Sequence, residues 1–384
     1  MSRLRTMVVF GTRPDAVKMA PLVKELEKHP EIEPIVCVTA QHRQMLDQVL
    51  DIFKITPAHD LNIMQDRQTL EQITVRALEG LAGVFDNDRP DIVLVHGDTS
   101  TCFVAALAAF YRKIPVGHVE AGLRTFDKYS PYPEEMNRRL ACALTDFHFA
   151  PTSANKSNLL HEGIPADKIY VTGNTALDAL KTTVKKDYTY QDPALKKLDL
   201  AGKRIIAVTA HRRENLGEPL EQICLALKDI ADRYDDVRIV YAVHLNPAVR
   251  ETAFRILGSN PGIHLIDPLD VQDMHNLMDR STLIMTDSGG IQEEAPALGK
   301  PVLVLRKETE RPEAVAAGTV KLAGTNREII RRSAIQLLDN AGEYAKMAKA
   351  VNPYGDGTAS ERIAKALLYE FGLGKVKPDE FKVR

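Results

Sequence analysis

The sequence has few cysteines, no long apolar run and no amino-terminal apolar stretch of signal length. The four cysteines are far apart in the 384 residues, and their spacing suits neither a zinc site nor a redox pair. No stretch approaches the roughly 18 to 20 apolar residues that a membrane span needs. We therefore expect a cytoplasmic protein that makes no membrane contact and keeps its cysteines reduced. The cysteines are Cys37, Cys102, Cys142 and Cys224.

The charges of the chain nearly cancel, since 50 lysines and arginines stand against 52 acidic residues and give a net charge of -2. This balance argues against binding to nucleic acid or to a membrane surface, so we expect a small molecule as the partner. The length predicts two domains, at roughly 100 to 200 residues for each.

No predicted strand is followed by the motif Gly-x-Gly-x-x-Gly, so we expect no tightly held nicotinamide cofactor. We expect no metal site either. The triplet Asp86-Asn87-Asp88 resembles the acidic metal-binding pair of many nucleotide-sugar transferases, but it precedes the next predicted strand. It therefore falls on the edge of the sheet opposite to the ligand side, and we interpret it as a helix-to-strand turn.

Two short apolar runs in the first half of the chain each end in charged residues. The runs 91–95 and 116–119 are separated by a helical segment, which is typical of neighbouring parallel strands. Ligands in such sheets bind beyond the carboxyl ends of the strands, where Asp98 and Glu120 fall. Glu134 follows in a proline-rich loop that leads into a helix. We expect these three carboxylates on one rim.

A first candidate for anion binding follows the strand predicted at 6–10, where residues 11–14 (GTRP) turn into a helix. The free backbone donors of a helix start can bind an anion, and Arg13 and Lys18 would add positive charge there. Alternatively, both are solvated residues of an ordinary helix start. The turn alone does not decide between these interpretations.

Polar clusters also follow the strands of the second half. The strongest anion signal is Ser288-Gly289-Gly290, because two glycines at a helix start let backbone amides approach a phosphate closely. Glu294, one turn into that helix, could accept both hydroxyls of a ribose. His211 stands beside two arginines at a strand end, which suits a diphosphate. The alternatives are an ordinary strand-to-helix turn and a structural histidine.

The alternation of strands and helices predicts an α/β fold with parallel sheets in two domains. Residues 185–202 lack periodicity and mark the boundary region. We expect one Rossmann-like domain over 1–172 and a second over 173–359, with a last helix at about 360–384 that packs back on the first. The predicted strands are 6–10, 34–39, 91–95, 116–119, 147–150, 168–172, 204–209, 238–243, 263–266, 282–286 and 301–305.

Six ordered motifs span nearly the whole chain: 11–21 (GTRPDAVKMAP), 96–99 (HGDT), 117–124 (GHVEAGLR), 133–138 (PEEMNR), 211–214 (HRRE) and 288–300 (SGGIQEEAPALGK). Together they resemble the bacterial non-hydrolysing UDP-N-acetylglucosamine 2-epimerases. One departure is Asp15, where that family usually has Glu, and it shortens a single side chain beside the first turn.

The resemblance implies two Rossmann-like domains facing across a cleft, as in the glycosyltransferase B architecture, and a homodimer. It implies interconversion of UDP-N-acetylglucosamine (UDP-GlcNAc) and UDP-N-acetylmannosamine (UDP-ManNAc), with UDP as a further ligand, for cell-surface polysaccharide. By motif, the catalytic residues would be Asp98, Glu120, Glu134 and His211. The nucleotide-sugar contacts would be Arg13, Lys18, Leu269, Met274, Ser288, Gly289, Gly290, Glu294 and Arg311. A second UDP-GlcNAc molecule would act as an activator at Gln41, Gln44, Arg67, Gln68, Arg212 and His244.

The chemistry of such a substrate agrees with this resemblance. The hydrogen at C2 of the sugar lies next to no carbonyl group, so an enzyme without a redox cofactor must first expel UDP from C1. Three alternatives stay open. They are a hydrolysing relative that releases free ManNAc, a relative acting on a 2,3-diacetamido sugar, and a glycosyltransferase or non-catalytic binder of UDP-sugars.

Overall fold

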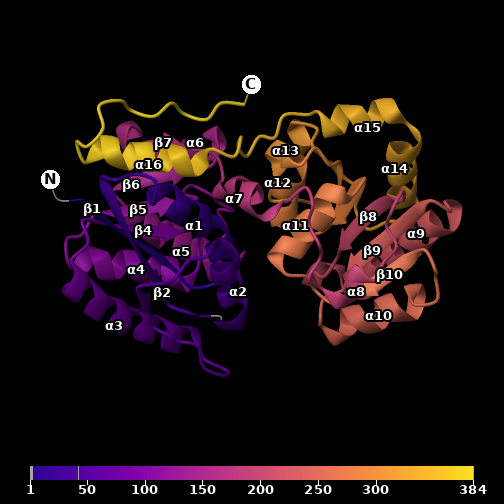
Figure 1. Ribbon diagram of the computed structural model, residues 1–384, viewed down its shortest axis with the longest axis horizontal. Helices are drawn as coiled ribbons and strands as arrows, with labels where there is room; N and C mark the ends of the chain where they lie inside the picture. Colours follow the sequence, from indigo (N-terminus) through magenta and orange to yellow (C-terminus); the bar gives the residue numbers. More distant parts are fainter. Residues whose placement is uncertain (1–2, 42, 384) are drawn as a thin grey trace. The chain divides into compact units, whose positions relative to one another are not determined.

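The computed structural model describes residues 3–41 and 43–383. The chain divides into two units, of which the first comprises Met1–Thr182 and Tyr354–Lys382 and the second comprises Thr183–Pro353 and Val383–Arg384. Each unit is built on one sheet in which all strands are parallel (Figure 1). The predicted fold class, α/β with two Rossmann-like parallel sheets, is therefore confirmed.

The first unit contains a 7-stranded sheet in the order β3-β2-β1-β4-β5-β6-β7. Its inner strands are buried along their length because helices cover both faces. The strands are β1 (Leu4–Phe10), β2 (Ile32–Val38), β3 (His59–Asp60), β4 (Ile92–His96), β5 (Val116–Val119), β6 (Phe147–Ala150) and β7 (Ile169–Val171).

The helices of the first unit form two rows. In one row α3 packs on α4 and α4 packs on α5, and in the other α1 lies between α2 and α16. The bounds are α1 (Arg13–Leu26), α2 (Arg43–Phe53), α3 (Leu70–Asp88), α4 (Ser100–Tyr111), α5 (Glu134–Ala143), α6 (Ser153–His161), α7 (Thr175–Thr183) and α16 (Ala359–Glu370), with a 3-10 turn at Ala166–Lys168.

The last helix, α16, belongs to the first unit although it begins at Ala359 and the preceding part of that unit ends at Thr182 (Figure 1). The carboxylate of Asp178, on α7, accepts the backbone N–H groups of Ala359 and Ser360. The N–H of Asn174 also donates to the carbonyl of Tyr354 at 2.7 Å. These bonds hold α7 and α16 together, so the chain crosses to the second unit after α7 rather than at residue 173.

The second unit contains a 6-stranded sheet in the order β10-β9-β8-β11-β12-β13. A buried apolar cluster lies between the sheet and the row formed by α10, α9, α14 and α15. The strands are β8 (Arg204–Thr209), β9 (Val237–Ala242), β10 (Ile263–Ile266), β11 (Leu283–Thr286), β12 (Val302–Val304) and β13 (Val320–Leu322). The helices are α8 (Pro193–Lys196), α9 (Glu218–Arg233), α10 (Pro247–Leu257), α11 (Val271–Arg280), α12 (Gly289–Ala297), α13 (Pro312–Ala316), α14 (Arg327–Asp339) and α15 (Ala341–Ala348), with a 3-10 turn at Arg213–Asn215.

Two strands and one turn differ from the sequence prediction. The short strands β3 and β13 were not predicted, and Asp86 to Asp88 form the last turn of α3 rather than a turn after it. Asp86 pairs with Arg112 at 2.7 Å and Asp88 lies 2.6 Å from His59, so the acids of this triplet hold neighbouring elements together. No metal role is needed to explain them.

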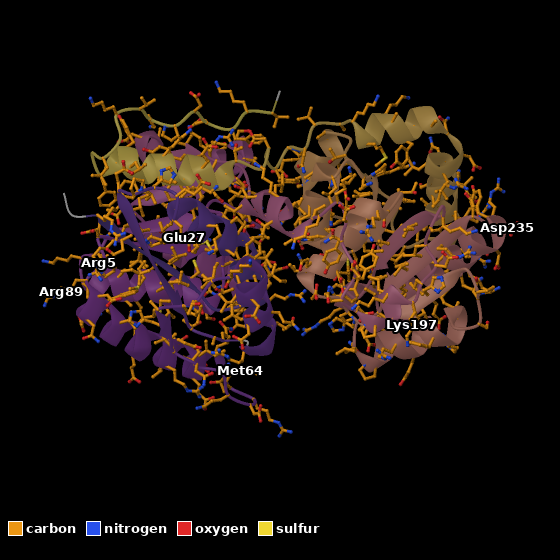
Figure 2. All side chains as sticks on the ribbon, in the orientation of Figure 1. Arg5, Glu27, Met64, Arg89, Lys197 and Asp235 are labelled. Carbon is orange, nitrogen blue, oxygen red and sulfur yellow. The ribbon has the colours of Figure 1, made fainter. Side chains whose placement is uncertain are left out.

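Charged side chains cover the outside of each unit, as Arg89, Lys197 and Asp235 illustrate (Figure 2). The apolar side chains gather inside, on both faces of the two sheets. None of the helices in the described part of the chain combines the length and the apolar character that crossing a membrane requires.

We predict that Asp178→Ala loosens the attachment of α16. The change removes the acceptor for two buried N–H groups, at 3.2 and 2.9 Å, and should lower the free energy of unfolding by about 1–3 kcal/mol. Urea denaturation measures this free energy of unfolding. The control Glu361→Ala, which breaks an exposed pair with Lys365 on the same helix, should cost less than about 1 kcal/mol. Equal costs for the two variants would contradict the assignment.

Candidate active site

Each sheet reverses its strand order at one pair of neighbouring strands. The pair is β1 and β4 in the first sheet, and β8 and β11 in the second. The loops that leave the carboxyl ends of such a pair turn to opposite faces of the sheet, and ligands of open α/β sheets bind at this point. Arg13, Asp98, His211 and Ser288 belong to these four connections, one residue to each.

Glu120 follows β5 directly and is buried, with 7% of its surface exposed. Both of its carboxylate oxygens accept hydrogen bonds from the ammonium group of Lys18 at 2.7 Å, and Oε2 lies 2.7 Å from Nε2 of His96. Its backbone has a φ of 64°, in the left-handed region that costs a residue with a side chain about 1–3 kcal/mol. This turn brings the carboxylate back to the end of β4.

The two cations fix the charge of Glu120. Burial alone raises the pKa of this carboxyl group, but Lys18 and His96 outweigh burial and hold the pKa well below its usual value. Burial lowers the pKa of His96, whereas Glu120 and the contact with Asp15 raise it to about 9. At neutral pH, Glu120 is therefore a carboxylate and His96 is a cation.

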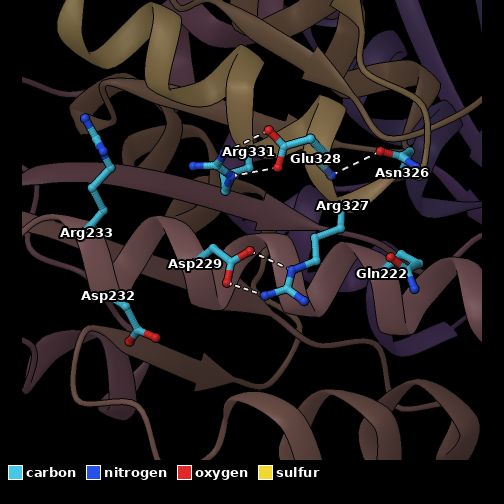
Figure 3. Close-up of a pocket in the computed structure, with 8 residues that line it drawn as sticks. All are labelled: Gln222, Asp229, Asp232, Arg233, Asn326, Arg327, Glu328 and Arg331. Carbon is cyan, nitrogen blue, oxygen red and sulfur yellow. Dashed lines mark hydrogen bonds and ion pairs between the residues drawn. The ribbon is translucent and has the colours of Figure 1, made fainter.

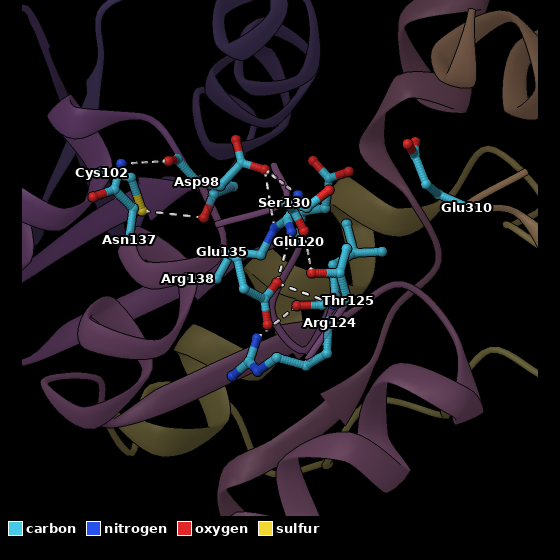
Figure 4. A network of polar contacts seen from close by, with 12 residues as sticks. Asp98, Cys102, Glu120, Arg124, Thr125, Ser130, Glu135, Asn137, Arg138 and Glu310 are labelled. Atoms are coloured by element: carbon cyan, nitrogen blue, oxygen red, sulfur yellow. Dashed lines mark hydrogen bonds and ion pairs between the residues drawn. The ribbon is translucent and has the colours of Figure 1, made fainter. Parts of the chain in front are cut away.

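Asp98 lies at the end of the neighbouring strand and is held by α5 (Figure 4). Its Oδ2 accepts from Nη2 and Nε of Arg138 at 2.6 and 3.0 Å, and its backbone carbonyl accepts from the amide of Asn137 at 2.9 Å. Burial raises the pKa of Asp98, Arg138 opposes this, and Glu120 and Asp15 add to the rise. Asp98, whose side chain is 29% exposed, is thus the more easily protonated of these two acids.

Glu134 is the first residue of α5 and is partly exposed. It lies four residues before Arg138, and residues four apart share one face of a helix. Because Arg138 contacts Asp98, this face is the one that meets the end of β4. The three carboxylates expected on one rim therefore lie after β4, after β5 and at the start of α5.

The turn after β1 is close-packed. A Cβ on Gly11 would lie 2.1 Å from Oγ1 of Thr39, so only glycine fits there without movement. Arg13, the first residue of α1, is half-buried. Lys18 is only 16% exposed and contacts Glu120, so it is not a solvated residue of an ordinary helix start.

In the second unit, Asp287 orders the loop that carries His211. Its Oδ2 accepts from the backbone N–H groups of His211 and Arg212 at 2.7 and 2.8 Å and from the side chain of Asn215 at 3.0 Å. The ring of His211 stacks on that of His244, with 5.1 Å between centroids and 13° between planes. Burial lowers the pKa of His211 although Asp287 opposes this, so the ring is neutral at pH 7.

Two guanidinium groups approach the amino terminus of α12. A Cβ on Gly289 would lie 3.8 Å from Nη2 of Arg311 and 3.9 Å from Nη2 of Arg212. Ser288 caps the helix without a side-chain bond to the first turn, which leaves the backbone donors there for other partners. Backbone donors and two cations at one helix start form a site for an anion.

The acids of α12 point to different partners. Glu293 is buried and pairs with Arg311, which fixes that guanidinium group. Glu294 lies 3.5 Å from Nε2 of His275, and Nδ1 of His275 lies 2.7 Å from the hydroxyl of Thr183. If the hydroxyl donates to Nδ1, the ring presents an Nε2–H to Glu294 and orients its carboxylate.

The remaining predicted contacts are more scattered. Leu269 is buried just before α11, and Met274 is half-buried on that helix. Gln41 accepts from Thr101 at 3.3 Å, and Gln68 accepts from Arg76 at 3.0 Å. Arg67 is exposed with a φ of 53°, and His244 is exposed beside His211. The side chain of Gln44 lies outside the described residues.

Sequence reasoning assigned no role to four residues that hold this arrangement together: His96, Arg138, Asp287 and His275. His96 and Arg138 fall inside motifs that the sequence analysis quoted, so position in a motif was the available signal. Asp287 directly precedes the glycine turn. Nothing in the sequence around His275 distinguishes it from a residue of an ordinary helix.

A hollow on the second unit lies apart from these residues (Figure 3). It is lined by α9 and α14, and its Arg327 and Arg331 are paired with Asp229 and Glu328 at 2.6 and 2.8 Å. No predicted site residue lines it. Over the residues with a described placement, no group of three or more His, Cys, Asp and Glu side chains could hold a metal ion.

A sequence model of the UDP-N-acetylglucosamine 2-epimerases matches residues 24–368. The Bacillus subtilis UDP-N-acetylglucosamine 2-epimerase is 59% identical over 382 residues, which cover 99% of each chain. The chain belongs to the UDP-N-acetylglucosamine 2-epimerase family. The resemblance stated from the motifs and the predicted enzyme class, an isomerase, are confirmed.

Solved structures of UDP-N-acetylglucosamine 2-epimerases agree with this assignment. The enzyme from Neisseria meningitidis bound to UDP-GlcNAc has a TM-score of 0.85 and 51% identity, covering 95% of this chain and 100% of that chain. S. aureus MnaA in a co-structure with UDP has a TM-score of 0.89 and 51% identity, with full coverage of both chains.

Proposed function

We propose that the chain interconverts UDP-GlcNAc and UDP-ManNAc by eliminating and re-adding UDP. The observation that carries this proposal is the group of three acids, Asp98, Glu120 and Glu134, at the strand ends of the first unit. The guanidinium-flanked start of α12 supports it from the second unit. A relative with 51% identity has been solved with UDP-GlcNAc bound.

The reaction runs in two halves. UDP leaves C1 with the bonding electron pair, positive charge develops at C1, and a carboxylate takes the proton from C2 to leave 2-acetamidoglucal. UDP then adds back to C1 while a proton arrives on the opposite face of C2. Because both faces of C2 exchange a proton, the reaction needs two proton-handling groups or one that moves.

The environments of the acids suggest different roles. Asp98, whose pKa is raised by burial, is suited to gain and lose a proton. Glu120 is held ionised by Lys18 and His96, and its negative charge would stabilise the positive charge that develops at C1. Glu134 is partly exposed on the same helix face as Arg138 and is the second group for proton transfer.

The second unit would bind the nucleotide. The start of α12 and the guanidinium group of Arg311 would hold the diphosphate. Each well-placed donor to the leaving diphosphate is worth roughly 3 to 4 kcal/mol by analogy with oxyanion sites. Glu294, oriented by His275, would accept the ribose hydroxyls, and His211 would contact the diphosphate as a neutral ring. Leu269 and Met274 would contact the uracil.

We further propose that a second UDP-GlcNAc molecule activates the enzyme. The stacking of His244 on His211 supports this, because it connects a residue of the activator set with one of the catalytic set. An activator changes the rate only to the extent that it binds the active conformation better. The other residues of the activator set are Gln41, Gln44, Arg67, Gln68 and Arg212.

Three further expectations accompany this function. A homodimer is supported by the exposed apolar side chains of Phe110, Tyr111 and Leu140 on the adjacent helices α4 and α5. A cytoplasmic location and a role in cell-surface polysaccharide stay predictions from the sequence. A hydrolysing enzyme that releases free ManNAc is the competing activity.

We predict that the purified protein converts UDP-GlcNAc to UDP-ManNAc in deuterated water without an added cofactor, with deuterium at C2 of the product. The exchange follows because the proton delivered to C2 comes from a group that equilibrates with solvent. Mass spectrometry and NMR measure it. Asp98→Asn should abolish the exchange, whereas His161→Ala, an exposed histidine on α6, should retain it. Unlabelled product would exclude this mechanism, and free ManNAc as the main product would establish hydrolysis.

We predict that Gly289→Val raises the Kd for UDP about 10-fold or more, which is about 1.4 kcal/mol. The branched side chain would fill the space between the first turn of α12 and the guanidinium groups of Arg212 and Arg311. Gly289→Ala is the matched control, because its methyl group makes only ordinary contacts at 3.8 and 3.9 Å. Calorimetry measures the Kd for UDP of both variants. Unchanged affinity in a folded Gly289→Val variant would leave this turn purely structural.

We predict a sigmoidal dependence of the rate on UDP-GlcNAc, and little reverse reaction from UDP-ManNAc until UDP-GlcNAc is added. His244→Ala should reduce the rate or the cooperativity while the Kd for UDP stays within about 2-fold, because His244 is not assigned to the nucleotide. Initial rates and calorimetry measure the two effects. Hyperbolic kinetics in the wild type together with full reverse activity on pure UDP-ManNAc would refute the activator.

A further inference from the structure

One buried histidine of the first unit lies between two carboxylates. Nε2 of His96 is 2.7 Å from Oε2 of Glu120, and Nδ1 is 3.5 Å from Oδ1 of Asp15. All three side chains are nearly inaccessible, with exposures between 4% and 7%. Asp15 is held from its other side by the hydroxyl of Thr99, which donates to Oδ2 at 3.2 Å.

This geometry favours the doubly protonated ring. Each ring nitrogen lies at ion-pair distance from a carboxylate oxygen, although neither meets the geometry of a hydrogen bond. A neutral imidazole has one nitrogen without a hydrogen, and in either tautomer that nitrogen would lie against a negatively charged oxygen. Among the four contacting residues Asp15, Lys18, His96 and Glu120, the charges balance only with a cation at His96. With a neutral ring, a net negative charge would remain in the interior, which costs several kcal/mol.

We propose that His96 is a positioning residue of the epimerase reaction: as a cation between Asp15 and Glu120, it keeps Glu120 ionised and fixes its carboxylate in place. This inference rests on the proposed function and adds a residue to it. His96 itself is buried and acts through Glu120. Proton transfer at C2 is then left to Asp98 and Glu134, because both oxygens of Glu120 are occupied by cationic partners.

The charged and titratable groups around His96 come from several elements. Asp15 and Lys18 lie on α1, and Glu120 follows β5. His118, on β5, donates to the carbonyl of Gly97 at 2.7 Å and is uncharged, since burial lowers its pKa to about 3. Two more groups are near: the thiol of Cys102, whose pKa burial raises, and the carboxyl of Asp98.

The first test measures the charge of His96 without any activity. The imidazole signals that disappear from NMR spectra of His96→Asn identify the residue, and in the wild type they should titrate near pH 9. Asp15→Asn should move this titration to lower pH, because it removes one of the two anions that favour the cation. A His96 ring that is neutral at pH 7 would overturn the proposal.

The second test is the pH dependence of the epimerase rate at low UDP-GlcNAc, which reports groups of the free enzyme. The cation is present below about pH 9 and is lost as the pH rises through that value, so the wild-type rate should fall there. Asp15→Asn should shift this fall to lower pH. His96→Asn should reduce the rate about 10- to 100-fold and remove the fall that His96 causes.

His148→Asn is the matched control. His148 is equally buried on β6, and its pKa of about 4 makes it neutral, so its loss changes packing but no charge near Glu120. The epimerase rate of His148→Asn should still fall near pH 9. If His148→Asn shifts this fall as far as Asp15→Asn does, the proposal is overturned. If the wild type does not turn over UDP-GlcNAc while His96 titrates near pH 9, the proposed function is overturned and the charge of His96 stands.

Discussion

The parallel pairing of the strands in both sheets is the constraint on which the rest of the structure depends. Helical crossovers bring the carboxyl ends of all strands in a sheet to one edge, so residues far apart in the chain meet there. Lys18, His96 and Glu120 meet in this way although they come from three different elements. The second sheet follows the same rule, which brings Arg212 and Gly289 together after β8 and β11. Neither group of residues could form on an isolated segment.

Burial then decides what these residues can do. An unpaired carboxylate in the interior of a protein costs several kcal/mol, so each buried acid needs its own partners. Glu120 has two cations and stays charged. Asp287 has backbone N–H groups instead and holds the His211 loop in place. Asp98 pairs with one arginine, Arg138, and its pKa stays raised. It is therefore the acid best suited to exchange a proton.

The sequence predicted most strands of the two sheets, but it predicted neither two of the edge strands nor the position of the crossover between the units. Short, unbroken apolar runs such as those of β4 and β8 are recognisable because both faces of their strands are buried. The two edge strands that were not predicted, β3 and β13, have two and three residues and leave too little periodicity to detect. The position of the crossover after α7 could not be predicted either, because it depends on hydrogen bonds between Asp178 and residues 181 and 182 positions later.

The candidate site shows the same limit at the level of single side chains. A motif identifies which histidines belong to a site but not their charge. His96 faces two carboxylates and is a cation, whereas His211 has one carboxylate at 3.6 Å, stacks on a second histidine and is neutral. A cation suits the fixed support of Glu120, and a neutral ring can donate to a departing diphosphate or accept a proton in turn. Burial lowers the pKa of both rings, and the charged neighbours of each ring then set the difference, so it follows from the folded structure and not from the motifs.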